Sequence, residues 1–262
     1  MDRLSGLDAS FLYFESGSML MHVCGLFVLD QSTMPEEYEF TRLRDRLHER
    51  VGGNPVFRRK LHSPVLNLDH PVWIEDDEFD IEHHVHRAIV PTPGTREQVA
   101  AVCSEIAAQQ LDRNRPLWEM WVLEGLEDGS IAVMTKMHHA TVDGVSGASL
   151  VSELCSLEPD APPLTAGKPK PAPPRRPSDT RIVVDGAFRL ATRPVKFARL
   201  MPSTLGSVTG WIERARRGRA MPAPFTAPRT SFNGTVTGHR SVAYVRMNLA
   251  DVKEVKNASA AR

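Results

Sequence analysis

Apolar positions recur along the first 158 residues with two different spacings, one typical of strands and one typical of helices. Short apolar runs predict strands, and the run 22–30 is expected to be a buried strand. Spacings of three and four predict amphipathic helices. The predicted strands are 22–30, 59–61, 72–74, 81–90, 118–123 and 131–137, and the predicted helices are 36–51, 95–111 and 144–157. This alternation of strands and helices predicts an α/β domain.

A proline-rich segment follows this domain. Eight prolines stand within residues 159–177, a density that forbids helix and central strand and predicts an exposed, semi-extended linker. Beyond it, the pattern predicts helix over 181–219 with interruptions at Pro194 and Pro202, a strand over 241–249 and the opening of a helix over 251–262. The predicted parts of the chain are therefore a domain over 1–158, a linker over 159–180 and a C-terminal segment over 181–262.

The formal net charge is zero, but the charges are unevenly distributed. Residues 1–160 carry 27 acidic and 13 basic side chains, whereas residues 161–262 carry 5 and 19. Within 187–220, eight Lys or Arg and one acid lie among aliphatic and aromatic residues, which suits the surface of an anionic bilayer. Helices docked on the acidic first half explain the same pattern, and composition does not choose between the two interpretations. The segment has no recognisable nucleic-acid-binding motif, so no DNA or RNA partner is expected.

The composition places further bounds on the class of protein. Of 262 residues, 41% are hydrophobic and 24% charged, which supports a packed core and excludes disorder throughout. No apolar run approaches the ~18 residues of a membrane span, and the N-terminus lacks the regions of a signal peptide, so a cytoplasmic protein is expected. Cys24, Cys103 and Cys155 lack the spacing of a zinc site or a disulfide framework and are expected to be reduced thiols.

The strongest chemical signal is the run Lys136–Gly147, which contains the pattern His-His-x-x-x-Asp-Gly between a predicted strand and a predicted helix. Successive strand residues point to opposite faces, so His138 and His139 are not expected to face the same cavity. Asp143 stands at the expected N-cap of the helix. Gly144 begins a run of small residues, which lets a substrate approach the backbone amides of the first helical turn.

An imidazole at this junction suits general-base chemistry. A neutral ring accepts a proton from an alcohol that attacks an acyl group, and the helix dipole favours the uncharged ring. Asp143 would oppose that effect if it came close, and we interpret it as a structural brace of the loop. His139 is the expected base, whereas for His138 a satisfied core histidine is the favoured interpretation.

Two other clusters raise the possibility of a metal site. His84 and His86 share one face of a predicted strand, but without further ligands nearby a solvent-facing strand is the favoured interpretation. The acidic run 75–80 is interpreted as a solvated turn rather than a cation site. The sequence contains no phosphate-binding loop, dinucleotide fingerprint or nucleophile elbow. No metal and no bound cofactor are expected.

Around the histidine motif, the sequence resembles the bacterial wax ester synthase/diacylglycerol acyltransferase family, a branch of the CoA-dependent acyltransferase superfamily. Further blocks resemble the family in the same order along essentially the whole chain. These blocks are Leu4–Leu12, Pro55–Leu61, Pro116–Gly125 with its Pro-Leu-Trp motif, and Pro228–Gly234.

The resemblance implies a chloramphenicol-acetyltransferase-like α/β fold, with an N-terminal domain of mixed sheet and flanking helices. Acyl-CoA and the acceptor would enter a channel between two domains, with acyl-CoA as co-substrate and no cofactor. His139 would deprotonate the hydroxyl of a diacylglycerol or a long-chain alcohol for attack on the thioester. His138 would support the site, and Asp143 would hold the geometry of the loop.

The resemblance also implies substrate-binding positions. These are Gly144 in the histidine motif, and Pro116, Leu117 and Trp118 in the Pro-Leu-Trp motif. For Trp118, ordinary core packing is the favoured interpretation.

Family members are nearly twice as long as this chain, which ends near the point where their second domain begins. The resemblance therefore implies a C-terminal half, in a longer polypeptide or as a separate chain. The main hypothesis is an acyl-CoA-dependent O-acyltransferase, peripherally associated with a membrane or lipid droplet. The alternative is a catalytically inactive, membrane-associated lipid-binding remnant. A condensation-type domain shares the histidine motif but predicts adjoining carrier or adenylation modules, which the sequence lacks.

Overall fold

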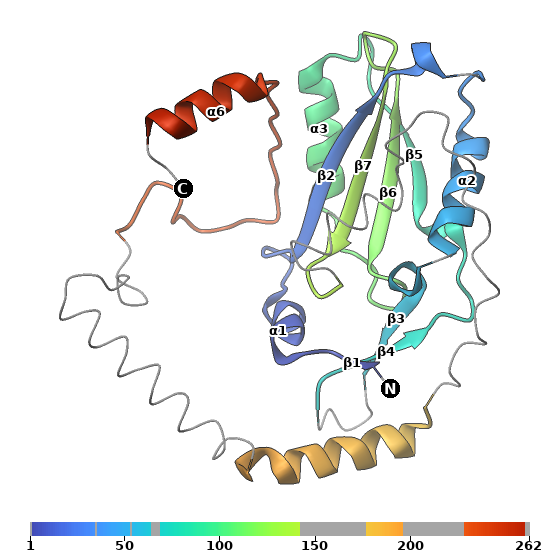
Figure 1. Ribbon diagram of the computed structural model, residues 1–262, viewed down its shortest axis with the longest axis vertical. Coiled ribbons are helices and arrows are strands. Elements are labelled where there is room, and N and C mark those ends of the chain that lie inside the picture. The colour runs from blue at the N-terminus through green and yellow to red at the C-terminus, as the bar shows by residue number, and fades with distance from the viewer. Residues whose placement is uncertain are drawn as a thin grey trace.

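A computed structural model describes residues 2–34, 36–52, 54–63, 69–141, 177–195 and 228–259. Its centre is a four-stranded sheet in the order β2-β7-β6-β5 (Figure 1). The strands are β2 (His22–Leu29), β5 (Val85–Ile89), β6 (Trp118–Glu124) and β7 (Ile131–His138). The sheet is mixed, because β2 and β6 pair antiparallel to β7 whereas β5 pairs parallel to β6.

Among the described residues, one helix covers each face of this sheet. α3 (Arg96–Ala107) lies on one face and α2 (Phe40–Gly52) on the other (Figure 1). α3 begins at a capping box, in which Thr95 accepts a hydrogen bond from the Gln98 amide and Gln98 accepts one from the Thr95 amide. The connection β5-α3-β6 is therefore the helical crossover that a parallel strand pair requires.

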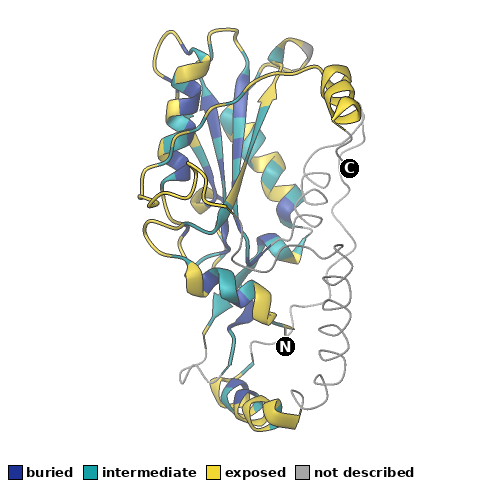
Figure 2. Cartoon of the chain, turned by 90° about the vertical axis from the view of Figure 1, so that its left-hand side faces the viewer, coloured by how far each residue is buried: buried dark blue, intermediate teal, exposed yellow. Residues whose placement is uncertain are grey.

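Each face of the sheet has its own apolar core (Figure 2). The core on the α2 face is formed by Val51, Phe57, Ile81, Val85, Trp118, Met120 and Val122. The core on the α3 face is formed by Val90, Val99, Cys103, Ile106, Ala107, Leu123, Ala132 and Met134. Side chains from β6 and β7 enter both cores, as expected for strands covered on two sides.

A second, smaller sheet adjoins the end of the main sheet at which β7 finishes (Figure 1). Its order is β1-β4-β3, with β1 (Asp2–Arg3), β3 (Arg59–His62) and β4 (Val72–Glu75). α1 (Gly6–Phe14) follows β1 and is capped by Ser5. A third core links α1 to both sheets through Leu4, Ala9, Leu12, Trp73, Leu111, Leu117 and Ala140. Short 3-10 turns are η1 (Gln31–Thr33), η2 (Pro55–Phe57) and η3 (Ile81–His83).

Residues 179–195 form a helix that docks on the small sheet. Ile182 is fully buried against Val72 and Ile74 of β4. Two ion pairs flank this contact, at 3.0 Å between Arg3 and Asp185 and at 2.9 Å between Arg193 and Asp69. Docking on the first half of the chain is one of the two interpretations of the basic segment. One face of helix 179–195 is docked in this way.

The C-terminal arm crosses the outside of α3 before it leaves the domain. The Val242 amide donates to Ser104 Oγ at 2.8 Å, and Val242 and Tyr244 pack against the α3 core. α6 (Leu249–Ala258) follows and has no buried residue (Figure 2).

The predictions for the strands are wrong in three respects. The run 22–30 forms β2, but its residues are half-buried or exposed, because among the described strands β2 lies at the edge and pairs on one side only. Residues 81–83 form a 3-10 turn, because the Asp80 side chain accepts the Glu82 amide and starts a turn before β5. The predicted strand 241–249 has no strand partner among the described residues, and its end is the start of α6.

The predicted helices exist with shifted ends. α2 begins at Phe40 rather than residue 36, and α3 ends at Ala107 rather than residue 111. The helix predicted from 181 begins at 179 and continues through Pro194. The predicted helix 144–157, most of the linker and residues 196–219 lie outside the described residues. The division into 1–158, 159–180 and 181–262 therefore stays a prediction.

Replacing Ile182 with alanine is expected to weaken the docking of helix 179–195 by about 2–4 kcal/mol, because it empties a fully buried site. Amide hydrogen exchange along this helix measures that free energy. Val184→Ala is the matched control, because Val184 is 63% exposed on the same helix and should change it by less than about 0.5 kcal/mol. Equal effects of the two variants would contradict the docked arrangement.

Candidate functional site

The histidine pair lies at the end of β7, where the strand gives way to a turn. Burial alternates along the strand, so that Lys136 and His138 are buried whereas Met137 and His139 are half-buried. This agrees with the prediction that the two histidines do not share a face.

His138 locks the turn that follows it. Its ring is 1% exposed, and its Nδ1 accepts a hydrogen bond from the Ala140 amide at 2.9 Å. The Thr141 amide donates to the His138 carbonyl at 2.9 Å, which closes a β-turn with His139 and Ala140 at its centre. Because Nδ1 accepts, the proton of the neutral ring is assigned to Nε2. His138 is thus a core residue whose side chain shapes the backbone of its neighbour.

His139 is held from two sides. Its amide donates to the Met21 carbonyl at 2.8 Å, and its ring stacks on Phe11 of α1 with centroids 4.8 Å apart and planes 19° apart. The ring remains half-buried rather than enclosed. Phe11 lies within the block Leu4–Leu12 that resembles the acyltransferase family, although its contact with the histidine motif was not predicted.

The Pro-Leu-Trp motif supports the same turn from the core. Leu117 and Trp118 are fully buried, and the Leu117 carbonyl accepts the His138 amide at 3.0 Å. The Trp118 indole donates to the Phe57 carbonyl at 2.8 Å and packs edge-on against the Phe57 ring. Core packing, the favoured interpretation of Trp118, describes this environment. The substrate-binding roles of Pro116, Leu117 and Trp118 stay predictions.

Asp143 and Gly144 lie outside the described residues. The roles predicted for them, as brace of the loop and as substrate-binding position, stay predictions. The turn at 138–141 is therefore the part of the motif whose geometry is established.

A buried acid beside His138 was missed at the sequence level. Glu15 is the C-cap residue of α1, and its side chain is 1% exposed. Its Oε1 lies 3.5 Å from His138 Nε2, while Oε2 accepts from Arg113 at 2.7 Å and from Gln110 at 2.9 Å. Burial raises the pKa of Glu15, but the hydrogen bonds from Arg113 and Gln110 outweigh it, so the net pKa is lowered and the group is a carboxylate. No local sequence pattern marks it, since Arg113 and Gln110 are about a hundred residues away.

The electrostatics of His138 keep the ring uncharged. Burial lowers its pKa from 6.5 to about 4, and the Glu15 carboxylate opposes that shift only in part. The His138 ring therefore stays neutral at pH 7, and its Nδ1 remains free to accept the Ala140 amide.

The other histidine cluster is structural. His84 is buried, stacks between Phe79 and Trp118, and donates from Nδ1 to the Trp118 carbonyl at 2.8 Å. The solvent-facing interpretation is therefore wrong for His84, because aromatic packing pulls the ring into the core. His86 is half-buried against Trp121. Within the described part of the chain, no three His, Cys, Asp or Glu side chains are grouped to hold a metal, and Cys24 and Cys103 are free thiols.

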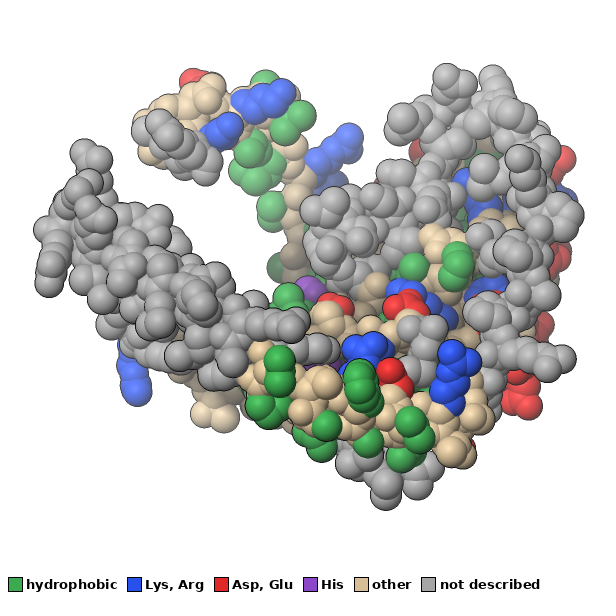
Figure 3. All heavy atoms as spheres, turned by 60° about the horizontal axis from the view of Figure 1, so that its bottom comes forward, with side chains coloured by type: hydrophobic (Ala, Val, Ile, Leu, Met, Phe, Trp, Pro, Cys, Tyr) green, Lys and Arg blue, Asp and Glu red, His purple; other side chains and the backbone are tan. Residues whose placement is uncertain are grey.

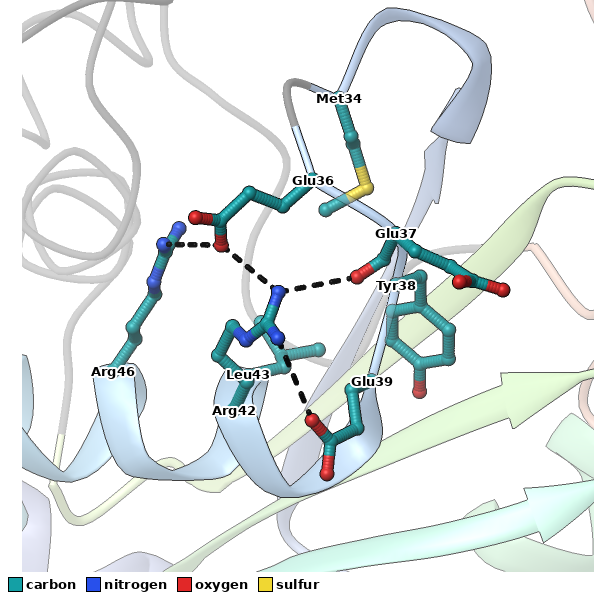
Figure 4. A pocket seen from close by; sticks show the side chains of 8 residues that line it. All are labelled: Met34, Glu36, Glu37, Tyr38, Glu39, Arg42, Leu43 and Arg46. Carbon is teal, nitrogen blue, oxygen red and sulfur yellow. Dashed lines mark hydrogen bonds and ion pairs between the residues drawn. The ribbon is translucent and has the colours of Figure 1, made fainter.

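A pocket beside the start of α2 lies at the opposite end of the main sheet from the histidines (Figures 1 and 4). Arg42 crosses it, with ion pairs to Glu36 at 2.8 Å and to Glu39 at 3.7 Å. Arg46 also reaches Glu36, at 3.5 Å. Arg42, Arg46, Glu36 and Glu39 are thus paired within the pocket, and none of the lining residues belongs to the predicted site.

In comparisons with known proteins, nearly the whole chain matches a single family. Residues 4–261 match the profile described as the wax ester synthase/diacylglycerol acyltransferase catalytic domain. Rv1760 of Mycobacterium tuberculosis H37Rv, named as a diacylglycerol O-acyltransferase, is 48% identical over 98% of this chain and 51% of its own length. A relative from M. tuberculosis CDC 1551 named tgs3 is 34% identical over 97% of this chain and 95% of its own length.

A solved structure supports the predicted fold. The wax ester synthase/diacylglycerol acyltransferase of Marinobacter aquaeolei VT8 matches with a TM-score of 0.65 and 28% identity, over 99% of this chain and 56% of that protein. The expected α/β fold of the CoA-dependent acyltransferase type, with a mixed sheet and flanking helices, is confirmed. The chain spans about half the length of the first curated relatives that it matches.

The buried neutral state of His138 predicts a dependence of stability on pH. Between pH 6.5 and about 4 the His138 imidazole is mostly protonated in the unfolded chain but mostly neutral in the folded chain. The free energy of unfolding should therefore fall with falling pH in this window, by up to about 1.4 kcal/mol per pH unit. Urea unfolding of His138→Gln should show a shallower slope than the wild type, whereas the exposed His83→Gln should not. Identical slopes for His138→Gln and the wild type would contradict the burial effect.

Proposed function

We propose that this chain, which belongs to the wax ester synthase/diacylglycerol acyltransferase family, supplies the general base of an acyl-CoA-dependent O-acyltransferase. The acceptor is a diacylglycerol or a long-chain alcohol, and the product is a triacylglycerol or a wax ester. His139 is the base, with His138 and Asp143 as supporting residues of the motif. The observation that carries the proposal is the half-buried His139 ring, displayed on a turn that its buried neighbour locks.

The proposed chemistry uses the imidazole of His139 as a base. The ring nitrogen takes the hydroxyl proton of the acceptor as the oxygen attacks the thioester carbonyl carbon. The resulting tetrahedral intermediate collapses with cleavage of the carbon–sulfur bond, and the protonated imidazole returns the proton to the departing CoA thiolate. The new ester and free CoA are the products, and the base is regenerated.

The remaining parts of the reaction need groups beyond those described. Gly144 and the small residues after it are proposed to let the thioester approach backbone amides, which are natural donors to an oxyanion. A C-terminal half, in the same polypeptide or a separate one, is proposed to supply the second wall of the substrate channel. This fits the half-length coverage of the first curated relatives.

Replacement of His139 by alanine is expected to reduce acyl transfer by about 100- to 10,000-fold, the usual loss on removal of a general base. The assay follows triacylglycerol formed from radiolabelled palmitoyl-CoA and diolein, with the chain alone and with the C-terminal half of Rv1760 added. His83→Ala is the control, because His83 is exposed and lies outside the motif.

The outcomes separate the two functional hypotheses. Turnover that is lost in His139→Ala and retained in His83→Ala supports the enzyme, and turnover only with the added half supports an incomplete one. Binding of diolein vesicles without turnover in either format would instead favour the inactive lipid-binding remnant.

Peripheral association with a lipid surface is proposed for the helix 179–195. Its inner face docks on β4 through Ile182, whereas Val184, Phe188 and Val195 are more than half exposed on the outer side. Figure 3 shows apolar side chains gathered on this face of the molecule, beside Lys and Arg. Such a face suits the boundary of an anionic bilayer. Among the residues with described structure, no helix is long and apolar enough to cross a bilayer.

The substitution Phe188→Asp is expected to weaken binding to phosphatidylglycerol-containing vesicles by about tenfold or more, because one aromatic side chain no longer enters the bilayer. Phe232→Asp is the matched control, since Phe232 is 93% exposed but lies on the C-terminal arm. Vesicle sedimentation at low and high salt measures the effect, and salt should weaken the wild-type binding. Equal binding to neutral phosphatidylcholine vesicles would argue against the electrostatic part of the proposal.

A further inference from the structure

Glu15 is a buried carboxylate that takes no part in the proposed reaction steps. Its carboxylate is 1% exposed, and burial of a charged group is costly unless the group is compensated. Compensation comes from Arg113, which donates to it from Nε at 3.2 Å and from a terminal nitrogen at 2.7 Å, and from Gln110. Arg113 also donates to the Leu12 carbonyl, so the same guanidinium fixes both the end of α1 and the carboxylate of its C-cap residue. These contacts aim the other oxygen, Oε1, at the histidine turn.

Oε1 is connected to the turn by two routes. The first route runs through the ring of His138. Nε2 of that ring is buried, lies 3.5 Å from Oε1 and has no hydrogen-bond partner within the described structure. A carboxylate at this distance favours the tautomer with the proton on Nε2. That tautomer leaves the Nδ1 lone pair for the Ala140 amide, the bond that locks the turn.

The second route runs through the backbone of a single residue, Met21. The Met21 amide donates to Glu15 Oε1 at 3.3 Å, and the Met21 carbonyl accepts the His139 amide at 2.8 Å. The residue that holds the backbone of His139 is therefore itself held by Glu15. Phe11, one helical turn before Glu15 on α1, supplies the ring on which His139 stacks.

We propose that Glu15 is a positioning residue for the general base. It lies outside the His-His-x-x-x-Asp-Gly motif, fixes the tautomer of His138 and the backbone of Met21, and thereby sets the turn that presents His139. The catalytic consequence rests on the proposed function of His139, whereas the effect on the turn does not. Glu15 acts through its neighbours and does not touch the substrate.

The substitution Glu15→Gln tests the proposal with little change of volume. A glutamine oxygen still accepts from Arg113 and Gln110, but its NH₂ group can donate to His138 Nε2 and so favour a proton on Nδ1. Glu105→Gln is the matched control, because Glu105 is exposed on α3. The full 262-residue chain, labelled with ¹⁵N, is examined by NMR for the tautomer of His138 and for hydrogen exchange at the Ala140 amide.

The wild type is expected to carry the His138 proton on Nε2. In Glu15→Gln we expect a population with the proton on Nδ1 and about tenfold faster exchange at Ala140, the loss of one hydrogen bond. Glu105→Gln should match the wild type. A wild-type proton on Nδ1 would overturn the proposal without any variant, so a Glu15→Gln chain that fails to fold does not prevent the test. A folded Glu15→Gln chain with wild-type tautomer and exchange would overturn it as well.

A kinetic measurement then separates positioning of the base from a general structural role of Glu15. In the preparation that shows turnover, Glu15→Gln should lower kcat by about tenfold or more and leave KM for palmitoyl-CoA within about twofold, because only the base is displaced. An unchanged kcat together with a displaced tautomer would overturn the link to catalysis. Absence of turnover in every preparation, the wild type included, would count against the proposed function, while the NMR result would still decide the role of Glu15 in the turn.

Discussion

The hydrogen bond from the Ala140 amide to Nδ1 of His138 is the constraint on which the rest of the site depends. It requires an imidazole that is buried, neutral and protonated on the other nitrogen, and each requirement has its own source in the fold. The position of His138 on the buried side of β7 encloses the ring, burial keeps the ring neutral, and the carboxylate of Glu15 faces Nε2. The first histidine of the pair therefore has a structural role in the turn, and the second is the proposed base.

Local features of this arrangement could be predicted from the sequence. The alternation along 131–137 gave the correct strand and the correct separation of the two histidines, because side-chain direction in a strand depends on parity alone. The cap at Thr95 and the apolar spacing of α2 and α3 are local in the same sense. The resemblance to the acyltransferase family identified the fold, which the comparison with the Marinobacter structure confirms.

Features that depend on tertiary partners could not be predicted. Nothing near Glu15 in the sequence indicates Arg113 or His138, since these contacts exist only after α1 packs against the end of β7. An apolar run such as 22–30 fits a central strand and an edge strand equally well, and the pairing partners decide between them. Composition also averages over the faces of a helix, so the basic C-terminal segment was compatible with both docking and lipid binding. In helix 179–195 one face is docked, and the exposed face is the one proposed to bind lipid.

The position of α1 at the very beginning of the chain has a practical consequence. Met19 is the next methionine after the first residue and stands just beyond α1. A polypeptide started there would retain every residue of the His-His-x-x-x-Asp-Gly signature, yet would lack the aromatic ring and the carboxylate that lie against it. Gene boundaries and expression vectors for such proteins should therefore be judged by whether they preserve the first fifteen residues, and an intact signature is an insufficient criterion.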